Sequence, residues 1–294
     1  SPLFFYIYCQ TKTMQLKLTD QQQTEYVLMQ SIEEDCFVDT NEKIEYPPVA
    51  LSLGEKLIKS SQGDSLLPIP IATFGNLSTI QAPPKTKKTF FVSLLASAFL
   101  SGKNHFSADI KGHRDNKTLL HIDTEQGKWH ASRVFKRTID MSGLSDVDFY
   151  HTYALRTLGY KERIQFIEYC LAHKFKNIGL IFIDGIADLV SDVNNLQECN
   201  LIVQKLMEWS ASYNCHITCV IHSNFGSDKP TGHLGSLLEK KSETQIQLEA
   251  NTVNKELVTV RCKRSRNFSF ETFSFKVNEK GYPEVVGDLY DPLK

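Results

Sequence analysis

A short polar segment, residues 82–89, has the side chains and the setting of a phosphate-binding loop. It lies between a short β-rich run and an apolar stretch that begins at Phe90. The backbone amides of such a loop can wrap around phosphate oxygens, while a lysine reaches the terminal phosphates and a hydroxyl group binds Mg²⁺. Lys88 and Thr89 suit these two roles, so we expect ATP and Mg²⁺ to bind here. The residues expected at the nucleotide are Ala82, Pro83, Pro84, Lys85, Thr86, Lys87, Lys88, Thr89 and Phe90.

The segment departs from the pattern GxxxxGK[ST] at both glycine positions, which Ala82 and Lys87 occupy. Glycine serves where a loop needs a positive φ angle or a close approach to its ligand. A lysine in the left-handed conformation costs about 1–2 kcal/mol, which an extra positive charge near the phosphates can offset. The alternative is a basic helix N-terminus on the surface. The regular series of strands and helices that follows favours the phosphate-binding loop.

Two acidic residues follow later strand-like runs, at positions where a bound triphosphate needs them. Glu125 comes soon after the run Thr118–Asp123, and we expect it to polarise the water that attacks the γ-phosphate. Asp184 ends the apolar run Ile178–Ile183, and we expect it to hold Mg²⁺, usually through water. The alternatives are an exposed loop acid for Glu125 and a helix cap for Asp184.

His222 ends a further strand-like run, His216–His222. At that position a polar side chain lies beside the γ-phosphate, senses whether nucleotide is bound and passes that state to the following loop. A histidine at a strand end is also commonly held by ordinary hydrogen bonds alone. Both interpretations stay open.

The elements that must position these residues alternate regularly from about residue 66 onward. β-rich runs are followed by helical stretches, which indicates parallel βαβ units with helices flanking the sheet. The last third shows period-two alternation instead, which predicts antiparallel strands at one edge. The sequence therefore predicts an α/β fold with a mostly parallel, twisted sheet. The expected strands are 77–81, 118–123, 149–154, 178–183, 216–222, 244–249, 256–262 and 270–277, and the expected helices are 88–100, 129–141, 161–174 and 195–213.

The 294 residues have the composition of an ordinary globular protein, which we divide into a small N-terminal segment, residues 1–66, and a core, residues 67–294. Lysine plus arginine number 33 against 34 acidic residues, so any contact with nucleic acid needs a local basic strip. Seven scattered cysteines without a CxxC pair favour a reducing, cytoplasmic compartment. The opening apolar run, residues 3–8, is too short to cross a membrane, and no membrane role is expected.

With its motifs in this order, the stretch from about residue 74 to 280 resembles the RecA-like P-loop ATPase family. It is most similar to hexameric replicative helicases of the DnaB and plasmid RepA kind, and to related ATPases of mobile elements. The resemblance implies that the glycine-rich segment Phe225–Ser236 faces a central channel and contacts single-stranded DNA. A surface loop without this role is the alternative. The residues expected to contact DNA phosphates are Lys229, His233, Lys240 and Lys241.

The resemblance also implies that the basic segment Arg261–Phe268 lies at a turn between two late strands and reaches the ATP site of a neighbouring subunit. Replicative helicases carry a Lys-x-Arg pair there, where this sequence has Arg264-Ser265-Arg266. Arg264 and Arg266 would stabilise transition-state charge in that neighbour. Such a site requires a homo-oligomeric ring or filament, and a ring of six is the family's expectation. A solvated basic turn is the alternative.

The function predicted from these features is an ATP-hydrolysing DNA motor, either a helicase or a helicase-like replication or mobilisation ATPase. One alternative is a recombinase that forms filaments on DNA. Another is a scaffold that regulates or tethers without hydrolysing nucleotide. The missing glycines favour the scaffold. The motor is favoured by the retained set of charged and polar groups, namely Lys88, Thr89, Glu125, Asp184, Arg264 and Arg266.

Overall fold

The computed structural model describes residues 19–59, 63–102, 104–105, 110–224, 229–251 and 254–286. The chain divides into two compact units, Ser1–Tyr46 and Pro47–Lys294. In the first unit, helix α2 (Asp20–Cys36) begins at a capping box, in which the side chains of Thr19 and Gln22 each accept the other residue's backbone N–H. Neither α2 nor any other helix of the described residues is long and apolar enough to cross a membrane.

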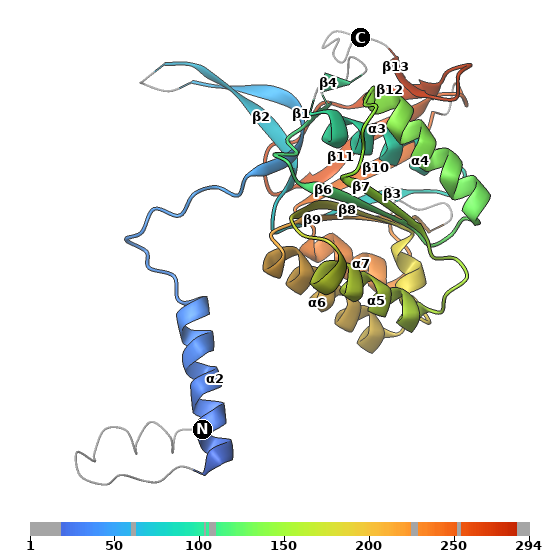
Figure 1. The fold of residues 1–294 in the computed structure, drawn as a ribbon. Coiled ribbons are helices and arrows are strands. Elements are labelled where there is room, and N and C mark those ends of the chain that lie inside the picture. The colour runs from blue at the N-terminus through green and yellow to red at the C-terminus, as the bar shows by residue number, and fades with distance from the viewer. Residues whose placement is uncertain are drawn as a thin grey trace. The chain divides into compact units, whose positions relative to one another are not determined.

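The larger unit is built on a nine-stranded sheet with the order β13-β12-β11-β10-β3-β9-β8-β6-β7 (Figure 1). The strands from β10 to β7 run parallel to one another, and β11, β12 and β13 add antiparallel strands beyond β10. The predicted α/β fold, a parallel sheet extended by C-terminal antiparallel strands, is confirmed. The strands are β3 (Leu77–Ala82), β6 (Thr118–Asp123), β7 (Tyr150–Ala154), β8 (Ile178–Asp184), β9 (His216–His222), β10 (Thr244–Ala250), β11 (Val258–Ser265), β12 (Phe273–Val277) and β13 (Pro283–Val286).

Helices cover both faces of this sheet (Figure 1). Helices α3 (Lys88–Ser101) and α4 (Lys128–Ser142) lie on one face. Helices α5 (Tyr160–Tyr169), α6 (Leu196–Ser212) and α7 (Gly232–Lys241) lie on the other. Each layer covers its own cluster of buried apolar side chains. Strand β8 is therefore buried at every residue, which explains why its sequence is continuously apolar and does not alternate.

Helix α3, which begins with Lys88, is buried along almost its whole length. The ring of Phe91 stacks on Phe275 of β12, with 6.2 Å between the ring centroids. On another side, strand β5 (Ile110–Gly112) approaches so closely that a Cβ atom at Gly112 would lie 2.1 Å from the Ala98 carbonyl oxygen. This packing fixes the start of α3, and with it the phosphate loop, against the sheet.

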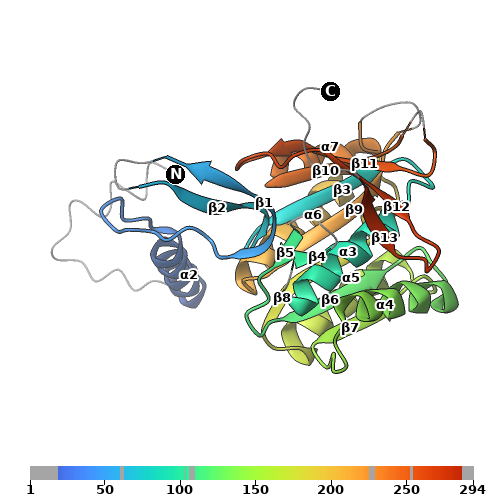
Figure 2. The same cartoon turned by 90° about the horizontal axis from the view of Figure 1, so that it is seen from above.

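A second sheet, with four strands in the order β2-β1-β5-β4, was not predicted. Strand β1 (Val49–Ile58) pairs antiparallel with β2 (Ser65–Thr73), and β4 is Asn104–His105. The far halves of β1 and β2 are largely exposed and form an arm that extends from the unit (Figure 2). Since β1 pairs with β2 and β5, the larger unit begins at Pro47, whereas the sequence placed the boundary after residue 66.

Candidate nucleotide-binding site

The strand order brings the carboxyl ends of β3, β9, β8 and β6 to one edge of the sheet. Ala82, the last residue of β3, pairs with His222 at the end of β9, and Asp123 of β6 pairs with Asp184 of β8. Ligands of open parallel sheets bind outside the carboxyl ends of the strands. The edge carries the residues that the sequence predicted for ATP and Mg²⁺, namely Lys88, Thr89, Glu125, Asp184 and His222.

The phosphate loop adopts the backbone geometry for which glycine is generally used. Lys87, the N-cap residue of α3, has φ 55° and ψ 30°, which is the left-handed conformation, and Lys85 has φ 64°. The Thr86 hydroxyl closes the loop by donating to the Pro83 carbonyl at 2.8 Å. The missing glycines therefore do not prevent the loop from forming.

The residues that follow the loop are held by helix α4. The Arg137 guanidinium donates to the Thr89 carbonyl at 3.2 Å and lies over the ring of Phe90, 3.9 Å from its centroid. Phe90, which the sequence placed at the nucleotide, packs beneath this arginine.

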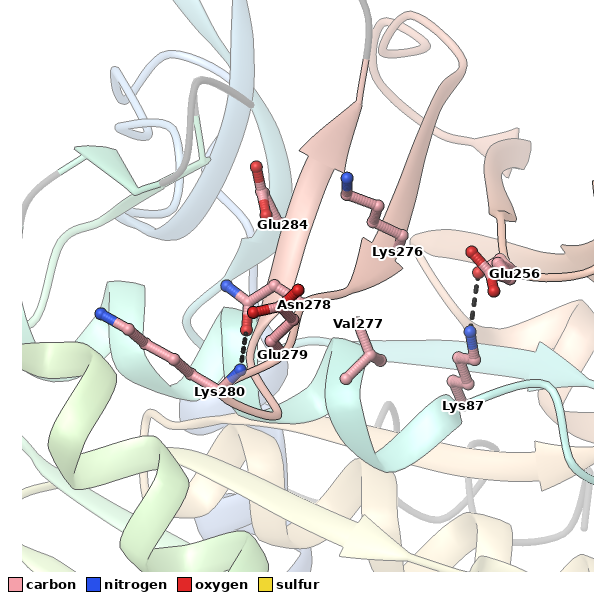
Figure 3. A pocket seen from close by; sticks show the side chains of 8 residues that line it. All are labelled: Lys87, Glu256, Lys276, Val277, Asn278, Glu279, Lys280 and Glu284. Carbon is pink, nitrogen blue, oxygen red and sulfur yellow. Dashed lines mark hydrogen bonds between the residues drawn. The ribbon is translucent and has the colours of Figure 1, made fainter.

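The side chain of Lys87 leaves the loop and joins the C-terminal strands. Its ammonium donates to the Glu256 carbonyl at 2.7 Å, in the connection between β10 and β11 (Figure 3). The sequence suggested that a second positive charge near the phosphates offsets the left-handed conformation. In this structure the ammonium is held by a hydrogen bond to a distant backbone carbonyl.

Lys87 also borders a cavity of about 750 Å³ (Figure 3). This volume lies within the range of pockets that hold small ligands. The lining is charged, with three lysines and three glutamates, and it does not include Lys88, Glu125 or Asp184. The cavity therefore adjoins the strand-end site through Lys87. Its lining residues are Lys87, Glu256, Lys276, Val277, Asn278, Glu279, Lys280 and Glu284.

Two substitutions of Lys87 test the left-handed conformation. Lys87→Gly is expected to change the free energy of unfolding by less than about 1 kcal/mol, because relief of the backbone strain offsets the lost hydrogen bond and the greater entropy of glycine. Lys87→Val is expected to lower it by about 1–3 kcal/mol, because a β-branched residue fits this conformation poorly. Urea unfolding of both variants measures the difference. Equal stabilities would mean that residue 87 is not left-handed.

Lys88 is buried and forms a chain of polar contacts with His222 and Glu125. Its ammonium lies 2.8 Å from His222 Nδ1, and His222 Nε2 lies 3.2 Å from Glu125 Oε1. A neutral imidazole can accept at the first nitrogen and donate at the second. Burial lowers the pKa of Lys88, against the opposing effect of the Glu125 and Asp184 carboxylates. The hydrogen bond from His222 lowers the pKa of Glu125, which is therefore ionised at neutral pH.

Asp184 is buried at the end of β8, and its Oδ2 atom has no hydrogen-bond partner among the described residues. Burial, followed by the charges of Glu125 and Asp123, raises the pKa of Asp184 to about 7. A bound cation would satisfy the unpartnered oxygen and favour the ionised carboxyl group. The site fits Mg²⁺ held by Asp184 and the Thr89 hydroxyl. Because no group of three His, Cys, Asp or Glu side chains in the described part of the chain could hold a metal, the other ligands would be water and phosphate.

Asp184→Asn tests this burial in the metal-free protein. The pKa of Asp184 is about 7 in the folded state against 3.8 for an ordinary aspartate, so its ionisation opposes folding as the pH rises between these values. At pH 8 the free energy of unfolding of the variant is expected to exceed that of the unaltered protein by at most roughly 4 kcal/mol, since one pKa unit corresponds to about 1.4 kcal/mol. At pH 4 we expect little difference. Urea unfolding in EDTA at both pH values measures the gain. An equal gain at both would contradict the raised pKa.

Two residues that the sequence did not single out shape the acidic end of the site. Asp123 accepts the backbone N–H groups of Glu125, at 3.0 Å, and Gln126, at 2.7 Å, and so forms the turn that carries Glu125. The Thr124 hydroxyl exchanges hydrogen bonds with the backbone of Gly185, at 2.8 and 2.9 Å, and joins the ends of β6 and β8. An aspartate before a turn is a local signal that could have revealed the first role. The second depends on a partner 61 residues away.

The residues predicted to contact nucleic acid gather around α7, on the face of the sheet opposite α3 (Figure 1). His233 and Lys240 are exposed and, being seven residues apart, lie on one side of the helix. Residues 225–228 of the predicted DNA-contacting segment lie outside the described residues. The four predicted contacts are Lys229 before the helix and His233, Lys240 and Lys241 within it.

Arg264 and Arg266 lie toward the opposite edge of the sheet from Lys88. Strand β11 runs antiparallel to β10, so its last residue, Ser265, pairs with Thr244 at the start of β10. The strand expected to end at Cys262 continues to Ser265, so Lys263 and Arg264 belong to the β11 ladder and the connection to β12 begins after Ser265. Both arginines are exposed, and Arg266 donates to the Lys241 carbonyl at 3.2 Å. Within one chain the structure does not bring them to the strand-end site.

Comparison with known proteins agrees with this architecture. The sequence matches the AAA domain family over residues 64–228, and no curated protein matches it. The fold is similar to the crystal structure of the RadB recombinase, with a TM-score of 0.53, 18% sequence identity, and coverage of 74% of this chain and 93% of that chain. At this identity the similarity concerns the fold alone, and it confirms the predicted RecA-like α/β architecture. Since the matched residues make up more than half of the chain, this protein belongs to the AAA domain family.

Proposed function

We propose that this protein is an ATP-dependent DNA motor that couples ATP hydrolysis to the binding of single-stranded DNA. The observation that carries the proposal is the contact of Lys88, His222 and Glu125 at the edge that also holds the unpartnered oxygen of Asp184. Phosphoryl transfer to water requires such a set: a lysine for the phosphates, a carboxylate that orients the water, and a carboxylate for the metal. Membership of the AAA domain family supports nucleotide hydrolysis.

Binding of ATP would exchange the partner of Lys88. Its ammonium bonds to His222 in this structure, and the terminal phosphates would take the place of the imidazole. Because burial lowers the pKa of Lys88, an anionic partner stabilises its charged form more than a neutral imidazole does. His222 would then be free to move with the nucleotide state, which is the sensor role predicted for it.

Hydrolysis would depend on Glu125. Its carboxylate is ionised at neutral pH, and the Asp123 turn fixes the backbone that carries it. It can therefore accept a hydrogen bond from the attacking water and orient that water toward the γ-phosphate. Mg²⁺, when held by Thr89 and Asp184, supplies the positive charge that neutralises the phosphate oxygens in the transition state.

A neighbouring subunit would complete the site. Among the described residues, no arginine bonds to Lys88, Glu125 or Asp184. We assign the missing cation to Arg264 and Arg266 of the next subunit, as the family resemblance implies. Their place toward the opposite edge of the sheet supports a head-to-tail contact, and such contacts form a ring when the rotation between subunits closes. A hexamer is the expected ring, with single-stranded DNA held by Lys229, His233, Lys240 and Lys241.

We place the protein in the cytoplasm, as an ATPase of replication or of a mobile element. The compartment rests on the cysteines. All of those that the structure describes are free thiols, and four of them, Cys170, Cys199, Cys215 and Cys219, are buried. Buried free thiols are typical of a reducing compartment.

A filament-forming recombinase is the second candidate, and the fold similarity to the RadB recombinase favours it. Electron microscopy with an ATP analogue and single-stranded DNA separates the two, because the motor forms closed rings and the recombinase forms continuous filaments.

The non-hydrolysing scaffold remains the third interpretation, based on the glycine-free loop. The left-handed Lys87 weakens that argument, since the loop reaches its geometry without glycine.

The experiment that tests the proposal is the rate of ATP hydrolysis with and without single-stranded DNA. We expect Mg²⁺-dependent phosphate release that oligothymidylate stimulates. Nucleotide binding without phosphate release under either condition would identify the scaffold instead. Hydrolysis that double-stranded DNA stimulates equally would contradict the single-strand preference.

A further inference from the structure

We propose that Lys263 is a positioning residue that couples helix α7 to the nucleotide-binding edge of the sheet. It does so through a polar relay that is partly shielded from solvent, defined here as Glu239, Lys263, Gln81 and Ser223. The inference rests on the proposed function, because it names the route by which a ligand at α7 affects ATP turnover. None of the four residues was predicted from the sequence to take part in the site.

The relay is a continuous chain of hydrogen bonds. The Lys263 ammonium donates to Glu239 Oε1 at 2.6 Å and to Gln81 Oε1 at 3.2 Å, and Gln81 Nε2 donates to Ser223 Oγ at 3.1 Å. Gln81 and Ser223 are 3% and 5% exposed, and the side chains of Lys263 and Glu239 are 20% and 19% exposed. Little water therefore screens the charged pair, and the chain of bonds is short enough to transmit a displacement.

The position of Lys263 is created by a β-bulge. The register of β10 against β11 shifts between Gln245 and Ile246, which pair with Arg264 and Cys262. Lys263 is thus the extra residue at this shift of register. Bulges re-aim side chains, and here the bulge lets a strand lysine bond to Glu239 of α7 and to Gln81 of β3.

Both ends of α7 are tied to the end of strand β9. At its start, the N–H and hydroxyl groups of Thr231 bond to the His222 carbonyl at 3.0 and 2.9 Å. Near its end, Glu239 connects through the relay to Ser223, the residue after His222. His222 in turn contacts Lys88. A nucleotide that replaces His222 as the partner of Lys88 therefore acts on residues 222–223, to which both ends of α7 are bonded.

The interface between α7 and the sheet is suited to rearrangement. Gln245, in the strand beneath it, is buried and bonds to the Glu239 carbonyl, while its Oε1 atom has no partner among the described residues. The Ser242 and Thr244 hydroxyls, just after the helix, also lack partners within the described ranges. An incompletely satisfied polar interface is cheaper to rearrange than a packed apolar one. The Lys263–Glu239 ion pair holds the end of the helix in this position, and the Arg266 guanidinium bonds to the last carbonyl of the helix, that of Lys241.

Stimulation of ATP hydrolysis by oligothymidylate tests the relay. Lys263→Met removes the ammonium and keeps an apolar stem. We expect it to leave the basal rate within about two-fold and to reduce the stimulation by about five-fold or more, which is the lower end of typical coupling between sites. Lys263→Arg retains the charge and should keep most of the stimulation. Glu239→Gln should match Lys263→Met, and the double variant should show no further loss.

The matched control is Lys205→Met, which breaks another part-buried lysine–glutamate pair, Lys205 with Glu168, that has no bond to the relay. We expect its stimulation to equal that of the unaltered protein, and thermal unfolding should show all variants folded. Full stimulation in a folded Lys263→Met variant would overturn the inference. An equal loss in Lys205→Met would overturn it as well, because the effect would then be one of general stability.

Hydrogen exchange at residues 232–241 gives a second readout that does not need hydrolysis. Adding ADP should change the exchange of α7 in the unaltered protein and not in Lys263→Met. An unchanged α7 in the unaltered protein, or the same response in the variant, overturns the relay. A protein that binds ADP but never hydrolyses ATP refutes the proposed function alone, and the exchange measurement then still decides on Lys263.

Discussion

ATP turnover is expected to fall at least roughly 100-fold when Lys88 is replaced by alanine, and the affinity for ATP should fall with it. The ammonium lies at the strand ends, where it bonds to His222 beside Glu125. A charged donor to the transferring phosphate typically contributes about 10²–10³ in rate. Phosphate release at saturating Mg²⁺ and ATP, together with titration of a fluorescent ATP analogue, measures both effects.

The fold should survive this change. Burial lowers the pKa of Lys88, so the charged lysine destabilises the folded state when no phosphate is bound. Alanine at this position removes the buried charge. Lys176→Ala is the matched control, since this lysine is exposed and precedes β8 at the other edge of the sheet. Turnover within a few-fold of the unaltered protein in a folded Lys88→Ala variant would mean that this loop does not bind the phosphates.

Replacing Glu125 with glutamine is expected to lower the rate of hydrolysis by about 10²–10⁴-fold while ATP still binds. Glutamine keeps the size of the side chain but loses the charge that orients the attacking water. It also changes the hydrogen-bond partner of His222, whose Nε2 lies 3.2 Å from the carboxylate. Binding and turnover therefore separate in this variant, whereas they fall together in Lys88→Ala. Single-turnover hydrolysis and calorimetric titration measure the two quantities.

Glu208→Gln, on the exposed side of α6, is the control for the loss of one acidic group. It should change neither quantity. If Glu125→Gln hydrolyses ATP at the rate of the unaltered protein, another group activates the water. If it fails to bind ATP, Glu125 has a role in shaping the loop and none in orienting the water.

The parallel core was predictable from sequence because each βα unit carries its own local pattern. Residues 178–183 are continuously apolar and form β8, and the helix expected over residues 88–100 is α3, which ends at Gly102 with φ 64°. Strand ends then follow from the patterns, and so do the groups that meet at the carboxyl edge. The pairing of Asp123 with Asp184 and of Ala82 with His222 depends on the strand order, which the sequence did not predict.

Elements fixed by distant contacts could not be predicted in this way. The sequence placed Phe225–Ser236 in a loop, yet α7 begins at Gly232 although glycine lowers helix propensity. Packing explains the difference at Gly235, where a Cβ atom would lie 2.5 Å from Pro230 Cβ. The relay around Lys263 was hidden for the same reason, because it joins Lys263 to Gln81, which lies 182 residues away in the chain.

The left-handed Lys87 shows how a motif can lose its marker residue and keep its geometry. Sequence reasoning anticipated the conformation, a lysine at positive φ, and did not anticipate the hydrogen bond that holds its side chain. The actual partner is the Glu256 carbonyl, in a connection between two strands that no local pattern ties to the loop. A comparable loop without glycine is therefore best judged by its φ angles and its distant contacts.

Calorimetric titration of the protein with ATP and Mg²⁺, under conditions in which hydrolysis is negligible, tests the central claim most directly. We predict one saturable site per chain, a higher unfolding temperature in the presence of nucleotide, and loss of both in Lys88→Ala. No heat of binding and no change in unfolding temperature, with the protein folded, would contradict the assignment of residues 82–89 as a phosphate-binding loop.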